Sequence, residues 1–281
     1  MAMASSVAAP AFAADQPAAA ASQAKPPKNA PYRNAALPTE ERVKDLLARM
    51  TLEEKVAQLL SLWGNKGEVQ DAQNKFNAAN ASKNYPNGVG QIARPSDQVG
   101  AASPRVVKRR SVADSVAYVN AAQKWAIEQT RLGIPILFHE ESLHGLAVMD
   151  GTSYPQAIGL ASSWDPDLIR DINAKIAEEA YPRGVRLVLA PVVDVAREPR
   201  WGRIEETLGE DPFLVGELGV AAVEGLQGKG TDPKLAPGKL YGTLKHMTGH
   251  GQPESGTNVG PAPISERTLR EMFFPPFHEV V

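Results

Sequence analysis

The sequence predicts an α/β fold in which helices surround a parallel β-sheet. Three strands begin near residues 134, 187 and 241, and each is apolar throughout instead of alternating between apolar and polar positions. Such strands are buried on both faces, as in a parallel sheet covered by helices. Helical segments separate them, so the architecture is either an open doubly wound sheet or a (β/α)8 barrel.

Capping residues mark the first two predicted helices. One helix begins at Thr39, and a second begins after Thr51, where Glu54 completes a capping-box pattern. Apolar residues follow the box at helical spacing, namely Val56, Leu59, Leu60 and Trp63. We expect both helices to lie on the surface and to pack through one apolar face.

The later elements alternate between strand and helix. In chain order they begin with a weak strand over 88–92, a helix over 111–131 and a buried strand over 134–138. Asp165-Pro166 and Asp211-Pro212 each cap a helix, and a buried strand follows each helix, over 185–192 and 240–244. Ser265 begins a last helix, which we expect Pro275-Pro276 to break.

Composition limits the classes of protein to which the chain can belong. It has 281 residues, 43% of them hydrophobic, and a formal net charge of −2, which predicts a globular body with no large positive field for nucleic acid. No apolar run approaches the roughly 20 residues that a membrane helix needs. Cysteine is absent, which excludes disulfides and thiolate metal sites.

The N-terminal 37 residues differ in composition from the rest. Residues 7–13 end in the small-residue pattern of a secretory signal, but the basic region and most of the apolar region of such a signal are missing. We interpret residues 1–37 as a clipped signal remnant followed by a disordered Ala/Pro linker, and residues 38–281 as the folded domain. This pattern predicts a periplasmic or secreted protein. The alternative is that the N-terminus is merely an Ala-rich tail.

Polar side chains follow each of the three strongest strands. They are His139, Glu140, Glu141 and His144, then the charged run over 197–206, and then Lys245, His246 and His250. In a barrel the carboxyl ends of all strands meet at one mouth, so these groups should converge. Sugar hydroxyls donate to carboxylates and accept from cations, which makes a polyhydroxylated ligand a good match. Trp201 would add an apolar platform for a sugar ring.

Lys245 and His246 are adjacent, although successive strand residues point to opposite faces. Both can reach one site only where the strand is irregular, so we predict a bulge, a twist or a non-proline cis bond there. A metal site is disfavoured, because Met247 stands where a zincin has glutamate between its histidines. A nucleotide cofactor is also disfavoured, because Gly249 and Gly251 lack the third glycine of the Rossmann pattern.

Five motifs together resemble glycoside hydrolase family 3. They are RVKDLLARMTLEEKVAQLLSLW (42–63), IPILFHEESLHG (134–145), YPQAIGLASSWDPDLI (154–169), REPRWGRIEETLGEDPFLVGELG (197–219) and LKHMTGHGQPESGTN (244–258). They occur in the family's order and cover most of residues 38–281. The resemblance implies an N-terminal (β/α)8 barrel and a following α/β sandwich domain.

The resemblance also implies an activity and a binding site. Members of the family are exo-acting retaining β-glycosidases that remove one sugar from a β-linked oligosaccharide or aryl glycoside, without a cofactor. By position, the substrate-binding residues are Glu141, Arg203, Lys245 and His246. Residues expected to support them are His144, Trp201, Glu206 and His250.

The chain departs from the family in what it lacks. A retaining mechanism needs two carboxyl groups about 5 Å apart. The family's nucleophilic aspartate and its acid/base would lie beyond Val281, and only five or six of eight strands are recognisable. We therefore expect a barrel truncated before closure, without catalytic residues of its own. The alternative is a non-catalytic carbohydrate-binding fragment or pseudoenzyme.

Two further differences bear on the sugar. The loop over 249–258 contains no aspartate, whereas the N-acetylglucosaminidase branch carries its acid/base there as an Asp-His dyad. Many family β-glucosidases have aspartate where Glu141 stands, and the longer side chain would crowd the C6 hydroxymethyl group of glucose. One methylene of pocket depth is worth about 1–3 kcal/mol, so xylose is favoured and glucose remains open.

Overall fold

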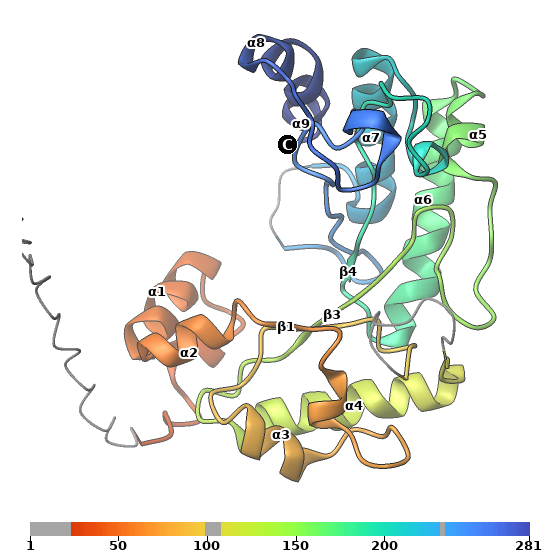
Figure 1. Cartoon of the computed structure of the whole chain (residues 1–281). Helices are drawn as coiled ribbons and strands as arrows, with labels where there is room; N and C mark the ends of the chain where they lie inside the picture. Colours follow the sequence, from red (N-terminus) through yellow and green to blue (C-terminus); the bar gives the residue numbers. More distant parts are fainter. Residues whose placement is uncertain (1–23, 99–107, 231–233) are drawn as a thin grey trace, which may run out of the picture.

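The structure is a computed structural model that describes residues 24–98, 108–230 and 234–281. Its centre is a parallel sheet of four short strands in the order β1-β2-β3-β4 (Figure 1). Their bounds are Ser61–Leu62 (β1), Gln91–Ala93 (β2), Leu137–Glu140 (β3) and Leu187–Val188 (β4). The fold class predicted from the sequence, a partial parallel α/β barrel, is confirmed.

The predicted strand over 240–244 lies beside β4 and continues the sheet. Tyr241 N donates to Arg186 O at 2.9 Å, and Val188 N donates to Tyr241 O at 2.9 Å. These bonds make a parallel bridge between Leu187 and Tyr241, and a second parallel bridge, further along, joins Val192 to Lys245. The pairing therefore extends as far as Lys245, which lies where this segment leaves the sheet.

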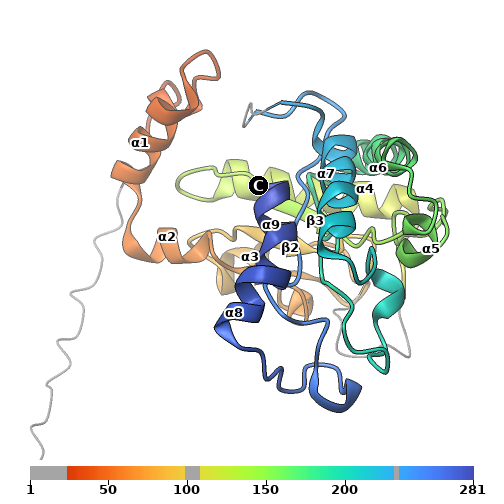
Figure 2. The same ribbon diagram turned by 90° about the horizontal axis from the view of Figure 1, so that it is seen from above.

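Helices cover the sheet on its outer side. Their bounds are Thr39–Arg49 (α1), Leu52–Ala57 (α2), Ala78–Asn84 (α3), Val112–Gln129 (α4), Ala157–Ala161 (α5), Pro166–Ala180 (α6), Pro212–Gln227 (α7), Glu266–Thr268 (α8) and Phe274–Val280 (α9). A π-helical turn over Leu269–Phe273 joins α8 to α9. In both views α1 and α2 lie at the opposite end of the sheet from α6 and α7 (Figures 1 and 2).

The predicted capping residues are confirmed at most helix starts. Thr51 and Glu54 form the complete capping box of α2. Asp165 accepts from Leu168 N at 3.0 Å, and Asp211 accepts from Phe213 N at 2.8 Å. At α1, however, the N-cap is Pro38, which makes no side-chain cap hydrogen bond.

The alternation of strand residues separates an apolar outer face from an inner face. Leu62 pairs with Ile92, and Ile92 pairs with Phe138. These three residues are at most 2% exposed and pack in one core cluster with Trp125 of α4. Neighbouring residues in each strand therefore point the other way, toward the inside of the curved sheet.

Residues 24–37 correct the predicted linker. A helical turn covers Pro31–Arg33, and Tyr32 is only 8% exposed. The Tyr32 hydroxyl and the Arg33 Nη2 both donate to Leu132 O, at 2.6 and 2.9 Å. These bonds attach the segment to the residue that follows α4 by three positions, so the segment is ordered. Residues 1–23, which include the predicted signal remnant, lie outside the described residues.

The predicted helix after Thr51 is shorter than its apolar spacing indicates. It ends at Ala57, because the chain turns into β1 and Gly90 N donates to Ala57 O at 3.0 Å. Gly90 permits this approach, since a Cβ atom there would lie 1.9 Å from Gln58 O. Val56 and Leu59 are 50% and 84% exposed, so the predicted packing through one apolar face is wrong.

Two other boundaries also differ from the predictions. Pro275 lies in the first turn of α9, directly after the π-helical turn, so the helical backbone continues through the proline pair and the predicted break is wrong. Strand β3 starts three residues later than predicted and includes His139 and Glu140, which we had placed in a loop. Within the described residues, no helix is long and apolar enough to cross a membrane.

Glu140 is the last residue of β3, and its carboxyl group is buried on the outer side of the sheet. It is 1% exposed, and its Oε1 accepts from Ser96 N at 2.8 Å. Lys66 lies in the same buried region, fully covered, and donates to the carbonyl oxygens of Arg94 and Asp97. Burial raises the pKa of Glu140 to about 7 and lowers that of Lys66 to about 8.

The raised pKa of Glu140 predicts a pH-dependent stability. Between its ordinary pKa of 4.5 and about 7, the unfolded chain loses a proton that the folded state keeps. The associated stability is therefore full below pH 4.5 and is lost as the pH rises to 7. Glu140→Gln cannot ionise, so between pH 5 and 8 its unfolding free energy should fall by about 2–3 kcal/mol less than that of the wild type.

Urea denaturation at the two pH values measures this difference. Glu53→Gln, the same substitution at an exposed position of α2, is the matched control and should follow the wild type. Equal pH dependence in Glu140→Gln and the wild type would contradict the prediction.

Candidate active site

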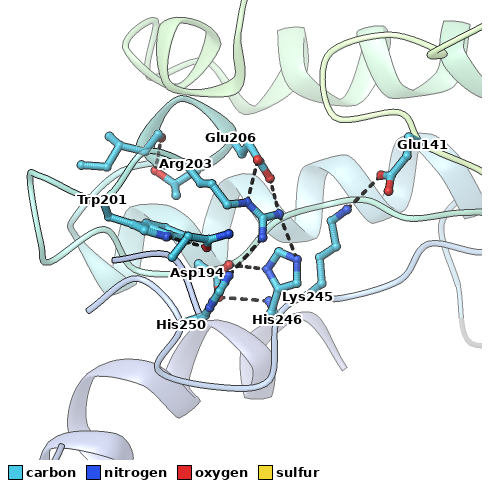
Figure 3. Close-up of polar contacts among 11 residues, drawn as sticks. Glu141, Asp194, Trp201, Arg203, Glu206, Lys245, His246 and His250 are labelled. Carbon is cyan, nitrogen blue, oxygen red and sulfur yellow. Dashed lines mark hydrogen bonds and ion pairs between the residues drawn. The ribbon is translucent and has the colours of Figure 1, made fainter. Parts of the chain in front are cut away.

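The four predicted sugar-binding residues lie together in the structure. They come from three loops that follow neighbouring strands (Figure 3). Lys245 Nζ donates to Glu141 Oε2 at 3.0 Å, across 104 residues of sequence. Arg203 Nη2 donates to His246 Nε2 at 3.2 Å. The predicted convergence of carboxylate, guanidinium, ammonium and imidazole groups is therefore present.

The irregular backbone predicted at Lys245 is also present. The Lys245–His246 peptide bond is cis, and so is the Met247–Thr248 bond. Of the three forms that we predicted, the non-proline cis bond is the one found. Both side chains reach the same cluster, with Lys245 on the Glu141 side and His246 on the Arg203 side (Figure 3).

Arg203 occupies the centre of the cluster. Its Nε and Nη2 donate to the two carboxylate oxygens of Glu206 at 2.8 and 2.7 Å, and its Nη1 donates to His250 Nε2 at 3.1 Å. Burial alone would raise the pKa of Glu206, but the hydrogen bonds and charge of Arg203 hold it below the usual value. The pair therefore stays ionised and fixes the guanidinium plane.

Asp194 is a site residue that we did not single out from the sequence. It is 2% exposed, and it accepts from His246 N at 3.0 Å and from His246 Nδ1 at 2.7 Å. The signal was a carboxylate inside the apolar run Val192-Val193-Asp194-Val195, since a buried charge requires a partner. Because Arg203 donates to Nε2 of this imidazole, the network assigns the proton of neutral His246 to Nδ1.

The predicted supporting residues have different positions. The His250 ring lies 4.7 Å from that of His246 and 4.9 Å from that of Trp201. Burial, followed by the charge effects of His246 and Arg203, lowers the pKa of His250. His144 contacts its own loop instead, with its Nδ1 2.9 Å from Tyr154 O.

Trp201 does not provide the platform that we expected. It is 2% exposed, its Nε1 donates to Asn258 Oδ1 at 3.1 Å, and its ring meets His250 edge to face. A ring packed in this way cannot present a face to a sugar. The ring does contact His250, and its supporting role stays a prediction.

Two features bear on which part of the molecule holds the ligand. A cavity of about 840 Å³ is lined by Trp164, Ile204 and Leu208, among others, but by none of the four predicted sugar-binding residues. Over residues 24–98, 108–230 and 234–281, no three His, Asp or Glu side chains are grouped so that they could hold a metal ion. The candidate site is the polar cluster, because the predicted sugar-binding residues meet there and do not line this cavity.

Fold and site together define a class of protein. A curved parallel sheet, wrapped by helices and carrying a charged cluster at the carboxyl ends of its strands, is the barrel-type α/β architecture with its ligand site at the mouth. Residues 51–281 match the family model described as "Glycosyl hydrolase family 3 N terminal domain". The chain belongs to glycosyl hydrolase family 3, as its motifs predicted.

Individual relatives agree with this membership. A putative beta-xylosidase of Formosa agariphila is 34% identical over 89% of this chain and 32% of its own length. Beta-glucosidase C of Emericella nidulans is 35% identical over 80% of this chain and 35% of its own. A solved b-glucosidase from Erythrobacter marinus superposes with a TM-score of 0.77 at 31% identity, over 90% of this chain and 32% of that one. The chain thus spans about a third of the length of these relatives.

The contacts of Asp194 predict the protonation pattern of His246. In the wild type, correlation of the ring nitrogens with their carbon-bound protons by NMR should show Nδ1 protonated and Nε2 bare. Asp194→Ala removes both carboxylate oxygens that accept from His246, so the fraction of rings protonated at Nδ1 should fall. The loss of these two buried hydrogen bonds should also lower the free energy of unfolding by about 2–4 kcal/mol. Asp171→Ala, at an exposed position of α6, should keep the wild-type pattern. An unchanged pattern in Asp194→Ala would contradict the assignment.

Proposed function

We propose that the cluster binds the terminal sugar of a β-linked oligosaccharide or aryl glycoside. In this proposal the protein to which the chain contributes is an exo-acting retaining β-glycosidase that uses no cofactor. The main support for this proposal is that side chains from three separate loops are in contact. Lys245 bonds to Glu141, and Arg203 bonds to His246. Membership of a glycoside hydrolase family supports the same reaction class.

The cluster has the donors and acceptors that a sugar ring requires. Lys245 has three N–H donors, and the structure gives it one side-chain partner, Glu141 Oε2. A sugar hydroxyl between these two groups would accept from the ammonium and donate to the carboxylate. Bonds of this kind, with one charged partner, are roughly twice as strong as neutral ones.

In this proposal the cluster binds sugar but does not supply the reacting carboxyl groups. Each nearby carboxylate already has a cationic or imidazole partner, Lys245 for Glu141, Arg203 for Glu206 and His246 for Asp194. A nucleophile must instead face the anomeric carbon, with a second carboxyl group about 5 Å away. We assign these two roles to residues outside the described cluster.

For the sugar, we propose β-D-xylose ahead of β-D-glucose. The support is the glutamate at 141, whose extra methylene would crowd a C6 hydroxymethyl group. The loop over 249–258 has no aspartate, which argues against a β-N-acetylhexosaminidase. We also propose a periplasmic or secreted location, supported by the small-residue pattern over 7–13.

The second candidate is a carbohydrate-binding protein without turnover. It is favoured by the same pairing of all three carboxylates, which leaves the cluster able to bind but with no free nucleophile. This candidate predicts sugar binding without release of an aryl leaving group. The β-glycosidase candidate predicts that the leaving group is released.

Arg203→Lys tests the proposed site directly. Lysine keeps the charge but cannot hold Glu206, His246 and His250 at once, so the affinity for methyl β-D-xyloside should fall at least roughly tenfold in isothermal titration calorimetry. Arg200→Lys is the matched control, because Arg200 lies three residues away and its side chain is 69% exposed. Among the described residues, that side chain pairs only with Glu198. It should bind within about twofold of the wild type.

The same titrations with methyl β-D-glucoside measure the sugar preference. Binding of the xyloside at least as tight as that of the glucoside agrees with the role proposed for Glu141, and a strong glucoside preference would reverse it. Equal weakening by Arg203→Lys and Arg200→Lys would contradict the placement of the site.

A further inference from the structure

Three side chains from adjacent strands form a row on the inner face of the sheet. Ala93 of β2 pairs with His139 of β3, and Trp63 follows Leu62, the last paired residue of β1. Leu62 and the other outward residues pack against α4, so the members of this row point inward. Glu141 stands two residues beyond His139 and continues on the same side. The row therefore lies one step deeper than the Glu141–Lys245 pair.

Ala93 is the small member of the row and lets its two neighbours meet. The Trp63 and His139 rings approach edge to face, with centroids 6.3 Å apart and planes at 76°. His139 is 4% exposed. The sequence had placed Trp63 on the apolar face of a helix and His139 in a loop, so this contact was not foreseen.

Both rings carry a buried polar atom that is not used in the structure. Trp63 Nε1 and His139 Nε2 have no hydrogen-bond partner among residues 24–98, 108–230 and 234–281. Leaving such an atom unpaired costs about 1–3 kcal/mol. Both unused atoms belong to one aromatic pair, and His139 precedes Glu141 by two residues, so the pair offers a donor and an acceptor to a ligand group near the cluster.

The two atoms have opposite hydrogen-bonding characters. Trp63 Nε1 is always a donor. His139 Nδ1 lies 3.1 Å from Gln91 Oε1 and donates to it, which leaves Nε2 as an acceptor. Burial, together with the charges of Lys66, Arg94 and Lys245, lowers the pKa of His139 to about 4, so the ring is neutral at neutral pH. A hydroxyl group, which accepts one hydrogen bond and donates another, matches this pair.

We propose that Trp63 Nε1 and His139 Nε2 form the floor of the sugar site and together bind one hydroxyl group of the terminal sugar. This inference rests on the proposed function. In it, Trp63 donates to the hydroxyl oxygen, and the hydroxyl hydrogen is donated to His139. A sugar that lacks this hydroxyl leaves two buried groups unpaired, so the pair acts as a specificity determinant for one position of the ring.

Deoxy sugars test the floor contact. The probes are methyl β-D-xyloside and its 2-, 3- and 4-deoxy analogues, titrated calorimetrically into the wild type and into Trp63→Phe, which keeps a ring but removes the donor. In the wild type, one analogue should bind at least about tenfold more weakly than the parent sugar. In Trp63→Phe, the loss for that same analogue should shrink to threefold or less.

Two further variants complete the cycle. His139→Phe removes the acceptor and should shrink the loss for the same analogue. Trp125→Phe is the matched control, because Trp125 is buried on the outer side and its Nε1 donates to Ser82 Oγ at 2.9 Å. It should discriminate between the analogues as the wild type does. Thermal melts establish which variants are folded, and Trp63→Phe alone decides if His139→Phe does not fold.

The outcomes separate this inference from the proposed function. Wild-type protein that binds the xyloside but treats all three analogues alike would overturn the floor contact and leave the sugar site standing. Undiminished discrimination in folded Trp63→Phe would overturn it as well, because the indole donor would then have no role. Wild-type protein that binds no xyloside would overturn both proposals.

Discussion

The site depends on one buried carboxylate. Asp194 accepts hydrogen bonds from both the backbone nitrogen and the Nδ1 of His246, which fixes the turn after the last paired segment and the tautomer of the ring. The Nε2 atom is thereby available to accept from Arg203, whose guanidinium orientation is already fixed by its two bonds to Glu206. A chain of charge-assisted bonds thus joins two loops before any ligand arrives, as preorganised binding requires.

The parallel sheet explains why such a cluster can form at all. Alternate residues of β1, β2 and β3 are divided between an apolar outer face, packed against α4, and an inner face that carries Trp63, His139 and then Glu141. All strands run the same way, so their polar ends accumulate at one edge. The outer residues form the core that stabilises the fold, and the inner residues face the candidate site. Each short strand therefore contributes alternate residues to the core and to the site.

Much of the fold and of the candidate site could be predicted from sequence, because helix caps and strand ends depend on residues that are close together in the chain. Asp165-Pro166 and Asp211-Pro212 mark helix starts by capping, and a lysine beside a histidine at a strand end predicted an irregular backbone. The errors arose where tertiary contacts override local pattern. The helix from Leu52 stops early because its chain must pair with β2, and Trp201 is covered by His250 and Asn258. Asp194 was passed over because its partner lies 52 residues away.

The central claim is that the three loops form a single sugar-binding site. A crystal structure of the protein with methyl β-D-xyloside bound tests it most directly. The account predicts one pyranose ring whose hydroxyl oxygens lie within hydrogen-bond distance of Lys245, Arg203 and Glu141. A sugar bound elsewhere on the molecule, with this cluster making no contact to it, would contradict the account.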